Sequence, residues 1–306
     1  MKVVVTGGTG AVGGAYCRAL VPAGYDVKVV SSRAEGKVKV FESLGPDWER
    51  TPQSVEDALL GNTRIDPLTD LGDYVKSLPF EQFDLSDRNS WTHNPFEKAD
   101  AVVLTSGNGD PDQGIESAQR NHAIDANSID AAVEAGVKVV IYTSSNWRTM
   151  ALVGKKLINA ETDEAPPRFV HYALAKAQSV RHLKDAASHN RDILFVYNDH
   201  CWYPRETFGC PPSNIAGAAL QYWVAECETQ MHVLKQLQLG DNPDFKDRNW
   251  HGFTVVSDNR TNRPGQPKFS YDISNSARLG VVHEFNVYDA LTNRDYSWRR
   301  IPVVMK

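Results

Sequence analysis

The sequence predicts an α/β protein built on a doubly wound parallel sheet, followed by a small C-terminal lobe. A β-branched run at residues 2–5 leads into a glycine-rich turn, a helical pattern over 11–20 and a second β-branched run over 26–30. Such runs are typical of strands that are buried on both faces. Three later apolar runs end in small or polar residues, at 99–107, 137–145 and 192–198.

The composition fits one large α/β unit. The chain has 306 residues, 41% of them hydrophobic, and a formal net charge of −5 with a pI near 6.0. This balance disfavours nucleic acid or an anionic membrane as a partner. No apolar run approaches the roughly 20 residues of a membrane helix, and the chain opens on a strand pattern without a secretory signal. We therefore expect a cytoplasmic protein with no nucleic-acid or membrane partner.

The cysteines do not form a recognisable metal motif. Cys17, Cys201, Cys210 and Cys227 are scattered, with none of the short spacings of a zinc knuckle. A site that combines His200 and His251 with two of these thiols is possible on paper only. We expect structural free thiols in a reducing compartment, and no metal.

The turn after the first strand carries the spacing Gly7-x-x-Gly10-x-x-Gly13. Glycines at this spacing let the backbone approach a pyrophosphate with no Cβ in between. The helix that follows would direct its first N–H groups at the phosphates. Nucleotide binding is therefore expected, and a purely structural tight turn is the alternative. The candidate contacts are Gly7, Thr9, Gly10, Ala11, Val12 and Gly13.

The end of the second strand indicates which dinucleotide binds. An Asp is common there and accepts hydrogen bonds from the adenosine ribose, but this chain has Ser31, Ser32 and Arg33. Hydroxyls and a guanidinium suit a ribose 2′-phosphate, which an acidic residue would repel. NADP is therefore favoured over NAD. In the alternative, these are solvated loop residues.

The string Thr6-Gly-Gly-Thr-Gly-Ala-Val-Gly13 resembles the extended branch of the short-chain dehydrogenase/reductase superfamily, the NAD(P)-dependent epimerase/dehydratase family. The resemblance implies that Asp84 and Leu85 contact the adenine ring, although Asp84 or Asp87 could simply form a turn that starts the next helix. It also makes Thr105, Ser106 and Gly107 strand-end contacts, with Leu-Thr-Ser where the family usually has His-Leu-Ala.

The same resemblance covers the amphipathic helix expected at 121–136. Asn121 and Asn127 match the family's Asn-x5-Asn, in which the first Asn supports the active site by hydrogen bonds. An Asn inside a helix is otherwise unfavourable. A surface location is the alternative for either residue.

A Tyr-x-x-x-Lys pair supplies candidate catalytic residues. Tyr172 and Lys176 are one helical turn apart and share a face. The Lys176 ammonium would lower the phenol's pKa from its usual value of about 10, so that Tyr172 could exchange a proton with a substrate hydroxyl or carbonyl. By resemblance, Ser145 at the end of the fifth strand holds the same substrate oxygen, and Lys176 reaches the nicotinamide ribose. Residues 147–150 depart from the family pattern, which we expect to affect the substrate pocket.

The pattern changes after the sixth strand. A helical stretch over 214–237 and a late strand over 252–258 predict a substrate lobe at 202–306, interleaved with the main sheet, after a Rossmann domain at 1–201. Residues 41–79 are broken by prolines; they are expected to lie over the adenosine side or to contact a neighbouring subunit.

Within the extended branch the chain looks most like uronate dehydrogenases and the sugar epimerases near them. The expected activity is hydride transfer between NAD(P) and a sugar or sugar-acid hydroxyl or carbonyl. Ser106, Asn146 and Arg205 are the candidate substrate ligands, with a surface ion pair as the alternative for Arg205. The rival functions are a nucleotide-sugar epimerase or dehydratase with tightly bound NAD, and a non-catalytic NADP-binding sensor. A homodimer is common in the family.

Overall fold

The computed structural model describes residues 1–32, 78–202, 221–260, 268–281 and 286, without the side chains of residues 226 and 227. The expectations for the segment 41–79 up to residue 77, for Arg33 and Arg205, and for Cys210 and the Cys227 thiol lie outside these residues.

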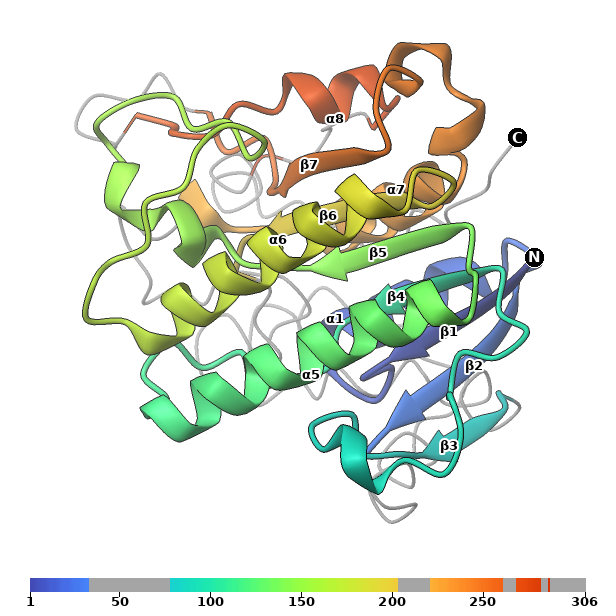
Figure 1. Ribbon diagram of the computed structural model, residues 1–306. Helices are drawn as coiled ribbons and strands as arrows, with labels where there is room; N and C mark the ends of the chain where they lie inside the picture. Colours follow the sequence, from blue (N-terminus) through green and yellow to red (C-terminus); the bar gives the residue numbers. More distant parts are fainter. Residues whose placement is uncertain (33–77, 203–220, 261–267, 282–285, 287–306) are drawn as a thin grey trace, which may run out of the picture.

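The described core is a seven-stranded sheet in which every strand is parallel to its neighbours (Figure 1). The spatial order is β3-β2-β1-β4-β5-β6-β7, so the chain reverses direction across the sheet after β3. The strands are β1 (Lys2–Thr6), β2 (Asp26–Ser31), β3 (Phe80–Gln82), β4 (Ala101–Leu104), β5 (Val139–Thr143), β6 (Leu194–His200) and β7 (Trp250–Val255). The doubly wound parallel sheet is therefore confirmed.

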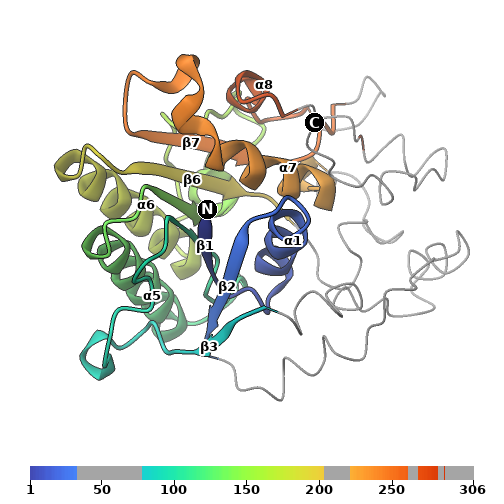
Figure 2. The same cartoon turned by 90° about the vertical axis from the view of Figure 1, so that its right-hand side faces the viewer.

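Helices cover both faces of the sheet, as Figure 2 shows. α5 (Ile115–Glu134) and α6 (His171–His189) pack together on one face, and α1 (Ala11–Leu20) and α7 (Glu226–Leu237) pack together on the other. The short helix α8 (Ser274–Arg278) lies beside β7. Short 3₁₀ helices connect these elements: η2 (Arg88–Ser90), η3 (Asn146–Leu152), η5 (Leu239–Asp241) and η6 (Pro243–Phe245).

Alternation along the central strands builds two cores. Val3 and Val5 of β1 belong to the cluster under α1 and α7, while Val4 belongs to the cluster under α5 and α6. All three are fully buried. Successive side chains of a strand point to opposite faces, so only a strand that is apolar at every position can serve both clusters. This requirement explains the continuous β-branched run at the start of the chain.

Most predicted elements lie within a few residues of the observed ones. The helix expected at 121–136 begins earlier, at Ile115, and ends just before Gly136, whose φ is +66°. The predicted helix at 214–237 is wrong over residues 223–225, because Trp223 forms a bridge with Trp202 and the Ala225 N–H donates to Ser257 Oγ. The late strand is β7, which pairs with β6 in the main sheet. The division into two domains stays a prediction.

The described residues include neither a membrane-crossing helix nor a metal-binding group of side chains. None of the helices described is long and apolar enough to cross a membrane. The same residues contain no group of three or more His, Cys, Asp or Glu side chains that could hold a metal ion. The rings of His200 and His251 are hydrogen-bonded to the carbonyls of Cys201 and Phe245.

Candidate active site

A cavity of about 920 Å³ lies at the carboxyl ends of the strands. This is where parallel α/β sheets bind ligands, beside the point at which the strand order reverses, and the volume falls in the range of ligand sites. Most predicted cofactor contacts line it: Gly7, Thr9, Gly10, Ala11, Val12, Gly13, Ser31, Ser32, Asp84, Leu85, Thr105, Ser106, Gly107, Asn121 and Lys176. Ser106, also a candidate substrate ligand, is among them.

The glycine turn forms one wall of the cavity with no room for side chains. Gly7 has a φ of +64°, and its carbonyl accepts from the Gly10 N–H at 2.8 Å. A Cβ on Gly13 would lie 2.4 Å from Gly7 O and 2.5 Å from Thr105 Oγ1. Gly10 caps α1 without a side-chain hydrogen bond. No side chain therefore caps the N–H groups of the first helical turn, whose residues line the cavity. These features fit a dinucleotide pyrophosphate.

The end of β2 forms the adenosine side. Ser31 is buried, and its Oγ lies 3.3 Å from Thr9 Oγ1, while Ser32 is exposed. Both line the cavity, and β2 ends without an acidic side chain.

Asp84 forms the turn that was one of its two expected roles, and it also lines the cavity; its contact with the adenine ring stays a prediction. Its Oδ1 accepts from the backbone N–H and the hydroxyl of Ser86, at 2.9 and 2.7 Å, which is a side-chain-stabilised turn. Its Oδ2 accepts from Arg120 at 3.0 Å, and both residues line the cavity. Although partial burial opposes it, the Ser86 and Arg120 contacts hold the pKa of Asp84 below its usual value. Asp87 separately caps η2 through the Asn89 N–H.

Two amides on α5 hold the loops that rim the cavity. Asn121 Oδ1 accepts from the Asn108 N–H at 2.8 Å, and its Nδ2 donates to the Asn108 carbonyl at 2.7 Å. Asn127 Nδ2 donates to the carbonyls of Leu85 and Ser86, at 2.9 and 3.3 Å. Asn121 is buried and Asn127 partly buried. Each amide therefore forms hydrogen bonds with backbone groups of a loop, which are not paired within a helix or a sheet.

Lys176 reaches the cavity wall from α6 and is held by a buried polar cluster. Its Nζ lies 3.2 Å from Asp125 Oδ2, 3.1 Å from the Tyr142 hydroxyl and 3.2 Å from the Thr143 carbonyl oxygen. Tyr142 donates to Asp125 at 2.6 Å. Burial and then the Asp125 charge raise the pKa of Tyr142 well above its usual value. The sequence prediction missed Asp125 and Tyr142, although Asp125 lies one helical turn after Asn121.

Tyr172 and Ser145 lie beside this cluster. Tyr172 is in the first turn of α6, is 6% exposed, and is close enough to Tyr142 to interact with it electrostatically. Ser145 lies two residues after the end of β5 and caps η3, with its Oγ accepting from the Trp147 N–H at 3.3 Å. Both side chains are buried rather than part of the cavity wall formed by the described residues.

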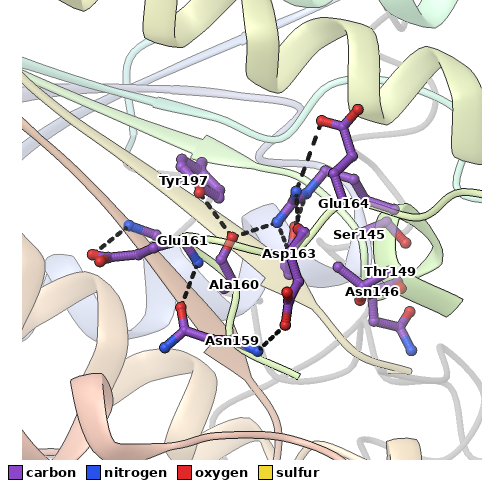
Figure 3. Close-up of polar contacts among 12 residues, drawn as sticks. Ser145, Asn146, Thr149, Asn159, Ala160, Glu161, Asp163, Glu164 and Tyr197 are labelled. Carbon is purple, nitrogen blue, oxygen red and sulfur yellow. Dashed lines mark hydrogen bonds and ion pairs between the residues drawn. The ribbon is translucent and has the colours of Figure 1, made fainter. Parts of the chain in front are cut away.

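Asn146 and Arg148 are buried side chains. Figure 3 shows Asn146, together with Ala160 and Asp163, whose carbonyls accept hydrogen bonds from Arg148. Asn146 Nδ2 donates to the Tyr271 hydroxyl at 3.1 Å. The Arg148 guanidinium binds both carboxylate oxygens of Asp199, at 3.0 and 2.5 Å, and the carbonyls of Ala160 and Asp163. The departure at 147–150 was expected to shape the substrate pocket. Arg148 anchors η3 to the end of β6, and the effect of residues 147–150 on the substrate pocket stays a prediction.

Trp202 is a further cavity residue that the sequence prediction did not assign. It follows β6, lines the cavity, is 39% exposed, and packs edge-to-face on the fully buried Trp223 with ring centroids 5.1 Å apart. The sequence feature that could have identified Trp202 is an aromatic residue just after the sixth strand.

The fold and the site define a dinucleotide-binding α/β enzyme with a Tyr-x-x-x-Lys pair on the helix after the fifth strand. A sequence profile of the "NAD dependent epimerase/dehydratase family" matches residues 3–198. The chain therefore belongs to this family of NAD-dependent enzymes, the extended type of short-chain dehydrogenase/reductase. No match is found among curated protein sequences.

Solved structures share the fold at low sequence identity. A mutated uronate dehydrogenase has 17% identity and a TM-score of 0.63, over 100% of this chain and 88% of that one. The UDP-Glc/GlcNAc 4-epimerase of Campylobacter jejuni has 14% identity and a TM-score of 0.65, over 98% and 99%. A glucuronic acid dehydrogenase from Chromohalobacter salexigens has 16% identity and a TM-score of 0.63, over 95% and 87%.

Proposed function

We propose that this protein is an NAD(P)-dependent oxidoreductase that acts on a hydroxyl or carbonyl group of a sugar or sugar acid. The observation that carries the proposal is that one cavity is lined both by the glycine turn and by Lys176. The nicotinamide, when bound, supplies or accepts the hydride. The structural neighbours named as uronate and glucuronic acid dehydrogenases support the sugar-acid class.

The protein's own residues have three roles in this proposal. Tyr172 exchanges a proton with the substrate oxygen, and Ser145 donates a hydrogen bond to the same oxygen. Lys176, one helical turn from Tyr172, favours the phenolate by its charge. Ser106 at the β4 end and Asn146 are the substrate ligands proposed within the described residues; Asn146 would have to exchange its bond to Tyr271.

NADP is the proposed cofactor, with NAD as the alternative. Ser31 and Ser32 line the adenosine side, and no carboxylate ends β2 to repel a 2′-phosphate. Neighbouring structures that contain NAD keep the alternative open, among them a uronate dehydrogenase variant from Agrobacterium tumefaciens. A comparison of kcat/KM for both cofactors decides between them.

An epimerase is the second candidate, because 99% of the Campylobacter jejuni 4-epimerase chain can be superimposed on this chain. An epimerase regenerates its cofactor within each turnover and retains it, whereas a dehydrogenase must release the reduced form. Nicotinamide fluorescence of the purified protein distinguishes the two.

We also expect a cytoplasmic protein that forms a homodimer. Sedimentation tests the oligomeric state.

The assay is a panel of sugars, uronates and simple alcohols with both cofactors, followed by nicotinamide absorbance. Tyr172→Phe should lower kcat about 100-fold or more, the range of general acid–base catalysis, with cofactor affinity unchanged. The matched control is Tyr25→Phe. It removes a phenolic hydroxyl just before β2, at the amino ends of the strands, whereas the cavity lies at their carboxyl ends. Equal turnover by Tyr172→Phe and wild type would refute the assignment of Tyr172.

A further inference from the structure

The ammonium of Lys176 is fully occupied by protein groups. An ammonium has three N–H donors, and Asp125, Tyr142 and the Thr143 carbonyl provide three acceptors within 3.2 Å. The side chains of Lys176 and Asp125 are 7% and 3% exposed. A buried ammonium at the cavity wall is thus paired with a buried carboxylate from the facing helix.

We propose that Asp125 is the counter-charge of Lys176: it positions the ammonium and limits how strongly Lys176 favours the phenolate form of Tyr172. This inference rests on the proposed function, since it takes Tyr172 as the proton-exchanging group. The motif Tyr172-x-x-x-Lys176 contains no carboxylate. Asp125 comes from α5, where it shares a buried face with Asn121.

The groups that face Lys176 come from α5, β5 and α6. On α5, His122 bonds to Ser179 Oγ at 3.0 Å, and burial lowers its pKa, so its ring is neutral near pH 7. On β5, Tyr142 remains a phenol because its pKa is raised. On α6, Tyr172 precedes Lys176 by one turn. The charges within the cluster are therefore one ammonium and one carboxylate.

More distant charges lie on the outer side of the two helices. Arg181 and His182 of α6 act electrostatically on His122. Asp130 of α5 lies 2.8 Å from the His182 ring, and its side chain is about half exposed. Solvent screens charges of this kind much more than buried ones, so Asp125 dominates the field of Lys176.

The sign of the effect follows from Coulomb's law. A positive Lys176 stabilises a nearby phenolate, and a negative Asp125 destabilises it. With both present, the two effects partly cancel at Tyr172. At the effective dielectric of about 20 that suits buried protein sites, a carboxylate about 10 Å away shifts a titration by about one pH unit.

Asp125→Asn tests the proposal, because the amide keeps the size and an acceptor for Lys176 but removes the charge. Tyr172 ionisation is measured as the tyrosinate absorbance of each protein minus that of its Tyr172→Phe derivative, across pH. We expect the midpoint to fall by about one pH unit in Asp125→Asn. Asp130→Asn removes a charge from the exposed side of the same helix and should leave the midpoint in place.

A midpoint that is unchanged or higher in Asp125→Asn would overturn the proposal. A double-mutant cycle provides a second measurement if that variant is too unstable to titrate. Asp125→Asn and Lys176→Met should each destabilise the fold, and the double variant should recover stability, since removing both charges leaves none buried and unpaired. Additive losses would contradict the pairing.

These readouts do not need turnover. If no substrate in the panel reacts, the proposed function fails while the tyrosinate titration still reports the effect of Asp125. If turnover is found and the midpoint does not move, the function stands and the role of Asp125 is refuted.

Discussion

The absence of a Cβ at Gly13 lets the first turn of α1 pack closely against Gly7 and Thr105 at the wall of the cavity. We predict that Gly13→Ala weakens NAD(P) binding about tenfold or more. Its Cβ would meet Gly7 O at 2.4 Å and Thr105 Oγ1 at 2.5 Å, and relieving such overlap costs about 1–3 kcal/mol. Fluorescence titration with the reduced cofactor measures the loss.

Gly114→Ala is the matched control for this prediction. Gly114 caps α5 with a φ of −68°, and an added Cβ would meet no described atom within 4 Å. Equal cofactor affinity in the two variants would show that the contact at Gly13 does not shape the site.

Individual cavity residues were predictable where a local motif fixes their place. The glycines, the strand-end residues Thr105 to Gly107 and Lys176 all follow from short strings in the chain, and all line the cavity. Asp125 and Tyr142 were not found, because their link to Lys176 joins α5, β5 and α6. No spacing within one element reveals such a contact. The catalytic roles of Ser145 and Tyr172 stay predictions.

Among the elements, η3 depends on one buried ion pair between Arg148 and Asp199. We predict that Arg148→Met or Asp199→Leu lowers the free energy of unfolding by about 3–5 kcal/mol, since either leaves a buried charge unpaired. Both side chains are at most 2% exposed. Denaturant unfolding measures the change, and the double variant should regain much of the loss.

The exposed pair of Arg88 and Glu134 provides a control for this prediction. Their side chains are 34% and 57% exposed, and exposed pairs typically contribute about 0–1 kcal/mol. A loss in Arg88→Met as large as that in Arg148→Met would contradict the argument from burial.

Elements were predictable where the apolar pattern is long and regular. The strands with continuous β-branched runs agree with expectation to within a few residues at most ends, whereas the helix expected at 121–136 is the later part of α5, which begins at Ile115. The structure around Trp223 was not predictable, because the apolar residues of this region also fit a helical repeat. Tertiary contacts decide there: Trp223 packs on Trp202, and its carbonyl accepts from the Asn259 side chain and the Ser257 N–H.

The stability of the whole molecule should fall as pH drops from about 6.5 to about 4. His200 is fully buried, and burial lowers its pKa from 6.5 to about 4. Below pH 6.5, His200 binds a proton in the unfolded chain but not in the folded protein. Falling pH therefore favours unfolding until the pKa of His200 in the folded protein is reached. Above pH 6.5 this contribution is constant.

His200→Gln tests this prediction by denaturant unfolding at a series of pH values. The stability difference between wild type and variant should stay constant from pH 8 to 7 and shift against wild type between about 6.5 and 4. Parallel curves over the whole range would show that His200 is not the group responsible.

At the scale of the whole fold, α5 is attached to three separate parts of the site. Asn127 and Arg120 hold the loop at the adenosine side, Asn121 holds the loop after β4, and Asp125 holds Lys176. A small rotation of this one rod about its long axis would shift all these anchor points together. The loop at the adenosine side and Lys176 are thus attached to one and the same helix.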